Sequence, residues 1–277
     1  MLLFHIFVMP MVIIKNILAL LLFFTSVSVQ ANKEIKVEHI IGKAFVENDV
    51  SPNKARKEAL NNAKIEALKK AGIGESVRAQ SLLFTSETNG DFKDFFSSSS
   101  QIEIKGAVKE YAITSERMFC KDSLLVIYEV IINATVIKYN KKADPAFTSN
   151  IQGIKQVYAS NSNLQFTLKS TQNCYLTIFN ITDTEAYMLY PNTYENEIKL
   201  EGLKEYNFPT GKLDYTLSNE TEQLETNRLI FVFTKKSIPF IKMNNEQVTS
   251  VEDVFSWIYS ISPDQRVSDY HSYFITK

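Results

Sequence analysis

The pattern of apolar and polar positions near the amino terminus predicts a strand followed by a long helix. Residues 35–46 are typical of a β-strand, and Gly42 within them indicates a bulge or a close approach of another backbone. Ser51 is a favourable N-cap, Pro52 suits the first helical position, and Gly72 suits the left-handed end of a helix. Small apolar residues then recur at helical spacing, at Ala55, Ala59, Leu60, Ala63, Ala67, Leu68 and Ala71. Such a face allows the helix to lie very close to a sheet, and we expect charged residues, Lys64 among them, to cover its other side.

The following segments have the composition of strands. Residues 101–115 alternate apolar and polar positions, residues 123–139 are rich in β-branched side chains, and residues 118–122 between them suggest a hairpin turn. Residues 32–140 are therefore predicted to form a small α+β module of one strand, a long helix and antiparallel strands. Residues 141–153 are polar, lack periodicity and contain Asp144-Pro145, which is typical of a linker.

Residues 154–277 show a different pattern, in which short apolar runs alternate with turn signals. This spacing predicts a β-sandwich-like domain. A helix is expected over residues 251–260, capped by Thr249 or Ser250, and a last strand over residues 270–275. The earlier strands are expected at residues 164–169, 175–180, 185–190, 196–203, 213–218 and 228–234.

The first 31 residues resemble an export signal. Lys15 precedes an apolar run at residues 17–24, and small or polar residues follow up to Ala31. We therefore expect residues 1–31 to be a signal peptide that is cleaved after Ala31 and leaves Asn32 as the new terminus, and translation from Met11 would fit this pattern better than translation from Met1. An uncleaved membrane anchor is the alternative, although Pro10, Lys15 and Asn16 interrupt the apolar stretch before it reaches the roughly 20 residues needed to span a bilayer.

Charge and cysteine content narrow the classes of function. The net charge is −1 and no basic stripe is evident, so the sequence offers no footprint for a phosphate backbone and we expect no nucleic-acid partner. Cys120 and Cys174 could pair in an oxidising compartment, but they fall in different predicted domains, which favours two buried free thiols.

Two resemblances to known families rest on short motifs. The strand over residues 42–46, the helix over 51–71 and the motif Gly106-Ala107-Val108-Lys109-Glu110-Tyr111 resemble a module shared by the lipoprotein-20 family and the amino-terminal part of flagellar assembly protein T. No cysteine directly follows the apolar run of this chain, so acylation at that position is not available. The carboxyl-terminal part resembles domain of unknown function 4384, through residues 174–180, 188–192, 208–209, 233–235 and the helix around Trp257. This resemblance implies an exported or envelope-associated accessory domain and carries over no catalytic residue.

No pattern in the sequence indicates a catalytic centre, a metal site or a cofactor. His39 and His271 stand apart from any ligand spacing, and no nucleophile elbow, zinc-protease or phosphate-loop motif occurs. The sharpest candidate for binding is the aromatic segment around Pro191, in which a platform for a glycan or peptide would involve Tyr187, Tyr190, Pro191, Asn192 and Tyr194. A structural turn with packed tyrosines is the alternative for the same residues.

These observations favour a non-catalytic, exported accessory or scaffold protein of the bacterial cell envelope that acts through protein–protein contacts. We expect a periplasmic or outer-membrane-associated location with envelope proteins as partners, and peripheral association with a membrane stays open. A glycan- or peptide-binding module is the second hypothesis, and an unrecognised hydrolase with residues scattered in sequence is the third.

Overall fold

The computed structural model describes residues 32–46, 51–74, 105–121, 125–182, 185–210, 213–219, 225–244 and 247–277. Residues Asn32–Lys277 form one compact unit. The predicted signal peptide, residues 1–31, lies outside the described residues, which begin at Asn32. The prediction of cleavage after Ala31 therefore stays untested. In the described ranges, no helix is both long and apolar enough to cross a membrane.

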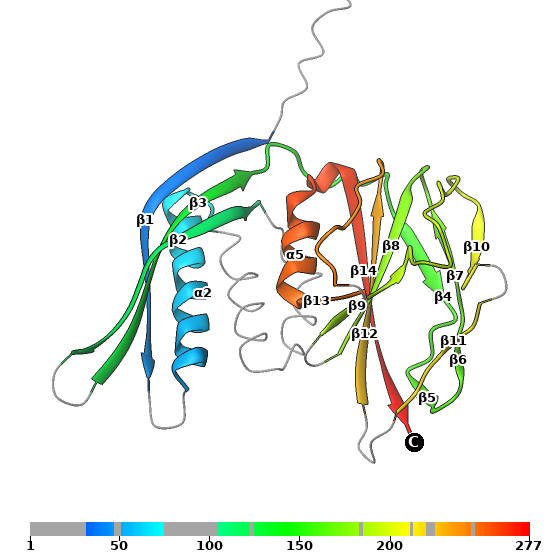
Figure 1. Ribbon diagram of the computed structural model, residues 1–277. Coiled ribbons are helices and arrows are strands. Elements are labelled where there is room, and N and C mark those ends of the chain that lie inside the picture. Colours follow the sequence, from blue (N-terminus) through cyan, green and yellow to red (C-terminus); the bar gives the residue numbers. More distant parts are fainter. Residues whose placement is uncertain are drawn as a thin grey trace, which may run out of the picture. The chain divides into compact units, whose positions relative to one another are not determined.

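The amino-terminal module is built on a three-stranded antiparallel sheet. Its order is β1-β3-β2, with β1 at Lys33–Val46, β2 at Gly106–Lys121 and β3 at Leu125–Lys138 (Figure 1). Strand β2 continues through Met118, where the sequence suggested that a hairpin turn begins. Residues 118–121 instead continue the strand, because Met118, Phe119 and Cys120 pair with residues of β3.

Helix α2, at Pro52–Lys70, covers one face of this sheet, as the alanine pattern predicted. The Ser51 side chain caps the helix by accepting a hydrogen bond from the Lys54 backbone N–H. Gly42 lies where the backbones of helix and sheet approach each other closely: a Cβ atom at this position would lie 2.0 Å from the backbone oxygen of Ala59 and 2.3 Å from the backbone nitrogen of Ala63. The predicted close approach of two backbones at Gly42 is therefore confirmed.

Lys64 departs from the expected pattern of the helix. Its side chain is buried, forms an ion pair with Glu252 and lies 4.5 Å from the centre of the Tyr111 ring. Periodicity alone placed Lys64 among the solvent-facing charges, because the sequence does not reveal that a distant segment covers this part of the helix.

The described residues of the carboxyl-terminal part form three sheets and one α-helix. The largest sheet has six strands in the order β13-β9-β8-β12-β14-β5, and helix α5 at Val251–Ser260 packs on one of its faces (Figure 1). Smaller sheets in the orders β10-β7-β4 and β11-β6 pack against the other face. The strands are β4 Ser149–Gln152, β5 Val157–Ala159, β6 Asn163–Leu164, β7 Phe166–Ser170, β8 Tyr175–Ile181, β9 Ala186–Tyr190, β10 Glu205–Phe208, β11 Tyr215–Thr216, β12 Glu225–Thr234, β13 Val248–Thr249 and β14 Arg266–Thr276, with a short 3₁₀ helix at Pro263–Gln265.

Strand β12 explains why this part has two cores. Leu229, Phe231 and Phe233 point into the core between the sheets, whereas Ile230 and Val232 point into the core beneath helix α5. A strand that is apolar at consecutive positions is typical of a sheet that is covered on both faces. The predicted α+β class, with a β-sandwich-like domain and one carboxyl-terminal helix, is confirmed, and Ser250 is the residue that caps the helix.

Two details of the predicted organisation are wrong. Residues 149–152 belong to strand β4 instead of a linker, and the nearby Phe147 is buried in the core between the sheets. Residues 196–203 form no strand, and only Leu200 makes a backbone bridge, to Cys174. Whether a segment forms a strand here depends on its pairing with a distant segment: residues 149–152 pair with β7, whereas residues 196–203 have only the bridge at Leu200. Local periodicity does not reveal such pairing.

Candidate functional site

Tyr190, the centre of the predicted aromatic platform, is fully buried. Its ring packs edge-on against Phe208, with 5.1 Å between the ring centres. Its hydroxyl donates a hydrogen bond to the backbone oxygen of Asn196 and accepts one from the backbone N–H of Ile198, each at 3.0 Å. Burial raises the pKa of Tyr190, so the hydroxyl stays protonated and holds the loop that follows β9.

Asn192 and Glu195 extend this arrangement into a buried polar network. The Asn192 Oδ1 atom accepts hydrogen bonds from the backbone N–H groups of Tyr194 and Glu195, both at 2.8 Å. The buried Glu195 carboxylate accepts from the Thr210 backbone N–H at 2.6 Å, from the Thr210 hydroxyl and from the Tyr215 hydroxyl. Burial, and then the hydrogen bond to Glu195, raise the pKa of Tyr215. Each of these polar groups has a partner within the chain, as a stable buried network requires.

The five residues of the predicted platform do not share one surface. Tyr194 is 82% exposed, Tyr187 is half-buried with its hydroxyl bonded to Glu185, and the half-buried Pro191 follows Tyr190 through a cis peptide bond. The alternative interpretation, a turn with packed tyrosines, describes the buried part of this segment. A binding role for the exposed Tyr194 stays an untested prediction.

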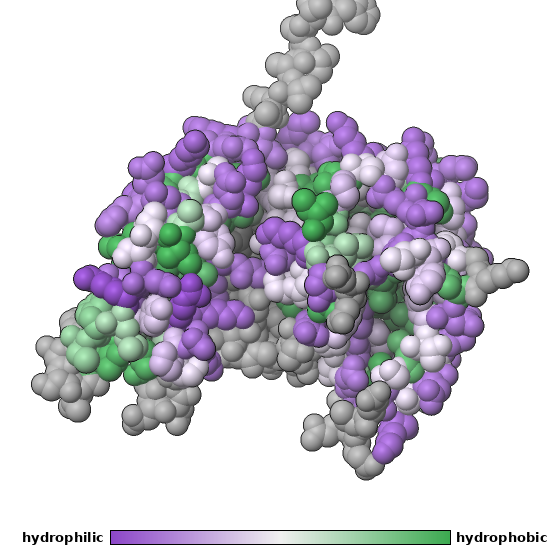
Figure 2. Space-filling model, in the orientation of Figure 1, coloured by the Kyte–Doolittle hydropathy of each residue, from purple (hydrophilic) through white to green (hydrophobic). Residues whose placement is uncertain are grey.

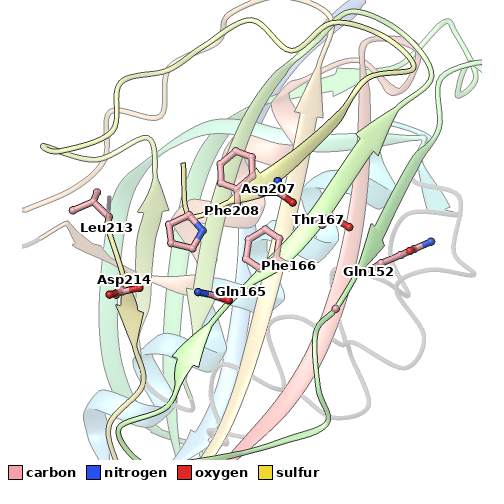
Figure 3. Close-up of a pocket in the computed structure, with 10 residues that line it drawn as sticks. Gln152, Gln165, Phe166, Thr167, Asn207, Phe208, Leu213 and Asp214 are labelled. Carbon is pink, nitrogen blue, oxygen red and sulfur yellow. The ribbon is translucent and has the colours of Figure 1, made fainter. Parts of the chain in front are cut away.

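A polar groove lies instead over the small β10-β7-β4 sheet. It encloses about 630 Å³, and Figure 3 shows its lining residues on several separate segments. Gln152 of β4, Thr167 of β7 and Asn207 of β10 are paired in register across the three strands, so their side chains form one row. Beneath this row, the rings of Phe166 and Phe208 stack in the core with 5.7 Å between their centres.

The polar side chains of this groove are not used by the fold. The side chains of Gln152, Gln165, Thr167, Asn207 and Asp214 make no hydrogen bond or ion pair within the described part of the chain. Pro209 and Leu213 add apolar atoms to the same wall. Sequence reasoning missed this site because a polar residue on the outer side of a strand is indistinguishable from an ordinary solvated one.

A second surface feature is a charged row on the face of the β1-β3-β2 sheet opposite to helix α2. Lys43, Glu129 and Arg117 are paired in register across the three strands. The Glu129 carboxylate lies between the two cations, with Nζ of Lys43 at 3.0 Å and a terminal nitrogen of Arg117 at 2.7 Å. These contacts lower the pKa of Glu129, the hydrogen bond from Lys43 contributing most. The carboxylate side chain is only 4% exposed, whereas those of Lys43 and Arg117 are 53% and 65% exposed, so the surface of this row is basic.

Apolar side chains flank the charged row on the same face. Phe45, 51% exposed, is paired with Ile127 and through it with Phe119, and Ile41, 40% exposed, lies on the opposite side of the row. The Arg117 guanidinium lies 4.9 Å from the centre of the Phe119 ring, which fixes both groups on this face. We call Ile41, Lys43, Phe45, Arg117 and Phe119 the outer face of the amino-terminal sheet.

The surface seen in Figure 2 is largely polar, and its apolar side chains gather in small separate groups. One such group lies over the far ends of β2 and β3. Met118 and Leu125, about half exposed, belong to these ends. The amino-terminal module therefore exposes apolar side chains at more than one position along its sheet.

The cysteines and histidines of the described ranges do not form a common site. Both cysteines are free thiols, and Cys174 is buried as expected, but the expected burial of Cys120 is wrong because this residue lies on an exposed part of β2. His271 packs edge-on against Phe231, and burial lowers its pKa, while the backbone N–H of His39 is bonded to the Asn133 side chain. Within the described ranges, no group of three or more His, Cys, Asp or Glu side chains could hold a metal ion.

The fold of the carboxyl-terminal part defines a β-sandwich-like domain with a helix on its larger sheet. Within it, residues 157–236 match the model of a family described as a domain of unknown function, DUF4384. This match confirms the resemblance predicted for the carboxyl-terminal part, although it ends before the helix around Trp257. The resemblance of the amino-terminal module to the lipoprotein-20 and flagellar assembly families stays a prediction. No curated protein matches the chain.

Proposed function

We propose that this chain is an exported, non-catalytic accessory protein of the bacterial cell envelope that acts by binding another envelope protein. The observation that carries the proposal is the outer face of the amino-terminal sheet. Protein interfaces combine exposed apolar and aromatic side chains with arginine, as this face does with Ile41, Phe45 and Arg117. Isolated exposed apolar residues need no explanation, but these lie together on one strand-paired surface.

The charge of this face indicates the chemistry of the partner. Both exposed ends of the charged row are cationic, and the only carboxylate of that row lies beneath them. A partner segment with apolar side chains next to Asp or Glu would complement this face. A segment that placed Lys or Arg opposite Lys43 and Arg117 would be repelled. We therefore propose an acidic, partly apolar segment of an envelope protein as the occupant.

The export component of the proposal rests on the sequence pattern that ends at Ala31. Mature protein recovered from the envelope fraction should begin at Asn32 when its terminus is sequenced. Recovery of an intact amino terminus in the cytoplasmic fraction would contradict export.

In-cell chemical crosslinking of the tagged, full-length protein, followed by mass spectrometry, tests the binding component. We expect one envelope protein to recur and to be lost in the double variant Lys43→Glu/Arg117→Glu, because the reversed charges repel an acidic segment. The matched control is Lys204→Glu/Lys199→Glu in the carboxyl-terminal part, where Lys204 is similarly exposed. Equal capture by both double variants would contradict the proposed surface, and thermal unfolding of each variant would verify that it is folded.

A further inference from the structure

We propose that the polar groove over the β10-β7-β4 sheet binds a neutral oligosaccharide that carries N-acetyl groups. This surface is separate from the outer face of the amino-terminal sheet, and the inference goes beyond the proposed protein contacts. The groove volume of about 630 Å³ falls within the range of about 300–1,000 Å³ that small-ligand sites usually have.

The lining chemistry matches hydroxyl and acetamido groups. Side-chain amides donate and accept hydrogen bonds at once, as does a threonine hydroxyl, and sugar hydroxyls require both functions from their partners. Gln152, Thr167 and Asn207 present these groups in one row, and Gln165 adds a second glutamine amide. Because none of them is bonded within the described part of the chain, a ligand would compete only with water for them.

The apolar and charged parts of the lining narrow the ligand class. Pro209 and Leu213 provide a surface for a methyl group, which an acetamido substituent carries next to its own donor and acceptor. Asp214 is the one charged side chain among the described lining residues, and its carboxylate disfavours an anionic sugar. Figure 3 shows Leu213 and Asp214 on one side of the stacked phenylalanines and Gln152 on the other, so a ligand that contacts all of them must be longer than one compact group.

A peptide is the less favoured occupant. Extended peptides usually add a strand to a sheet edge and are held by backbone hydrogen bonds. Here the available groups are side chains that run across all three strands, including the central strand β7, whose two edges are already paired. The groove therefore offers side-chain recognition on a sheet face.

Isothermal titration of the mature, full-length protein with chitopentaose and cellopentaose tests the inference, because these two probes differ in the acetamido group. We expect chitopentaose to bind at least about tenfold more tightly than cellopentaose, which corresponds to about 1.4 kcal/mol. Gln152→Ala and Asn207→Ala should each weaken chitopentaose binding at least about fivefold, since each removes a hydrogen-bonding partner.

The matched control is Asn150→Ala, which removes an exposed amide from the same face of β4 at a position outside the groove. It should leave the affinity unchanged. No detectable binding of chitopentaose at millimolar concentration, equal affinity for cellopentaose, or equal effects of the Asn150 and Gln152 variants would each overturn the inference. So would tighter binding of a neutral, asparagine-containing pentapeptide, which would assign the groove to peptides.

Discussion

The carboxyl-terminal domain contains two polar regions that differ in how their side chains are used. Around Glu195, buried polar groups bond to one another and join the loop after β9 to the segment that leads into β11. Around Thr167, the side chains of Gln152 and Asn207 reach into an open groove and have no partner within the described part of the chain. The first region stabilises the fold, and the second is available to a ligand.

A cluster of aromatic and polar residues in the sequence is not by itself evidence of a binding surface. The tyrosines and asparagine that looked most like a binding platform belong mainly to the bonded region, because Tyr190 and Asn192 complete the hydrogen bonding of a loop. A buried polar group is stable only when it is bonded, so burial turns a conspicuous residue into a structural one. Mutations should therefore separate the two regions by their effects on stability.

The largest effect is expected for Glu195→Ala, which leaves the Thr210 N–H and the Tyr215 hydroxyl without their buried acceptor. The free energy of unfolding should fall by about 4 kcal/mol, because several buried donors lose their partner at once. Urea unfolding followed by circular dichroism measures this loss. A loss below about 1 kcal/mol would mean that water or a neighbouring group replaces the carboxylate, and that the network is not structural.

The second largest loss of stability is expected for Gly42→Ala, which disturbs the packing of helix α2 on the amino-terminal sheet. The added methyl group would overlap the backbone of helix α2 at Ala59 and Ala63, so the helix must move and the free energy of unfolding should fall by about 3 kcal/mol. Gly74→Ala is the matched control, since its Cβ would meet nothing within 4 Å. Equal unfolding midpoints for the two variants would contradict the close approach of helix and sheet.

Asp144 provides a pH-dependent test near the start of the carboxyl-terminal domain. Hydrogen bonds from Lys235, from the Ala146 N–H and from Gln172 lower the pKa of Asp144 from 3.8 to about 2. Because the folded-state pKa is the lower one, the ionised carboxylate stabilises the fold above about pH 4, and this contribution is lost as the pH falls towards 2. Unfolding midpoints measured between pH 5 and pH 2 should therefore decline less steeply in Asp144→Asn than in the unchanged protein. Asp214→Asn, which removes an exposed carboxylate without a hydrogen bond or ion pair in the described part of the chain, is the control variant for these measurements.

The smallest effect on stability is expected in the groove. The double variant Gln152→Ala/Asn207→Ala should change the free energy of unfolding by less than about 0.5 kcal/mol, because neither side chain is bonded within the described chain. Urea unfolding under the conditions used for Glu195→Ala gives the direct contrast. A loss above about 1.5 kcal/mol would show that these amides support the fold.

Local sequence signals predicted the elements that depend on nearby residues. The cap at Ser51, the alanine face of α2 and the close approach at Gly42 are encoded within one strand and one helix. The long strand β12 was also recognisable, since it is buried on both faces and apolar at consecutive positions. These features need no knowledge of distant contacts.

Features that depend on distant partners were not predictable. Strand β4 exists because it pairs with β7, and Lys64 is buried because Glu252 approaches it. The groove was missed for a related reason: register across three strands assembles Gln152, Thr167 and Asn207, which are separated by long stretches of sequence. No local pattern distinguishes these three residues from solvated ones.

The most direct test of the proposed function is photo-crosslinking in cells from a benzophenone side chain placed at position 45. Position 241 is the control, because Ile241 is also an exposed apolar residue, 82% exposed, but lies in the carboxyl-terminal domain. The proposal predicts that position 45 captures one envelope protein through a segment rich in acidic and apolar residues, that the capture weakens at high salt, and that position 241 does not capture it. Capture of the same proteins from both positions, or none from position 45, would contradict the role of the outer face of the amino-terminal sheet.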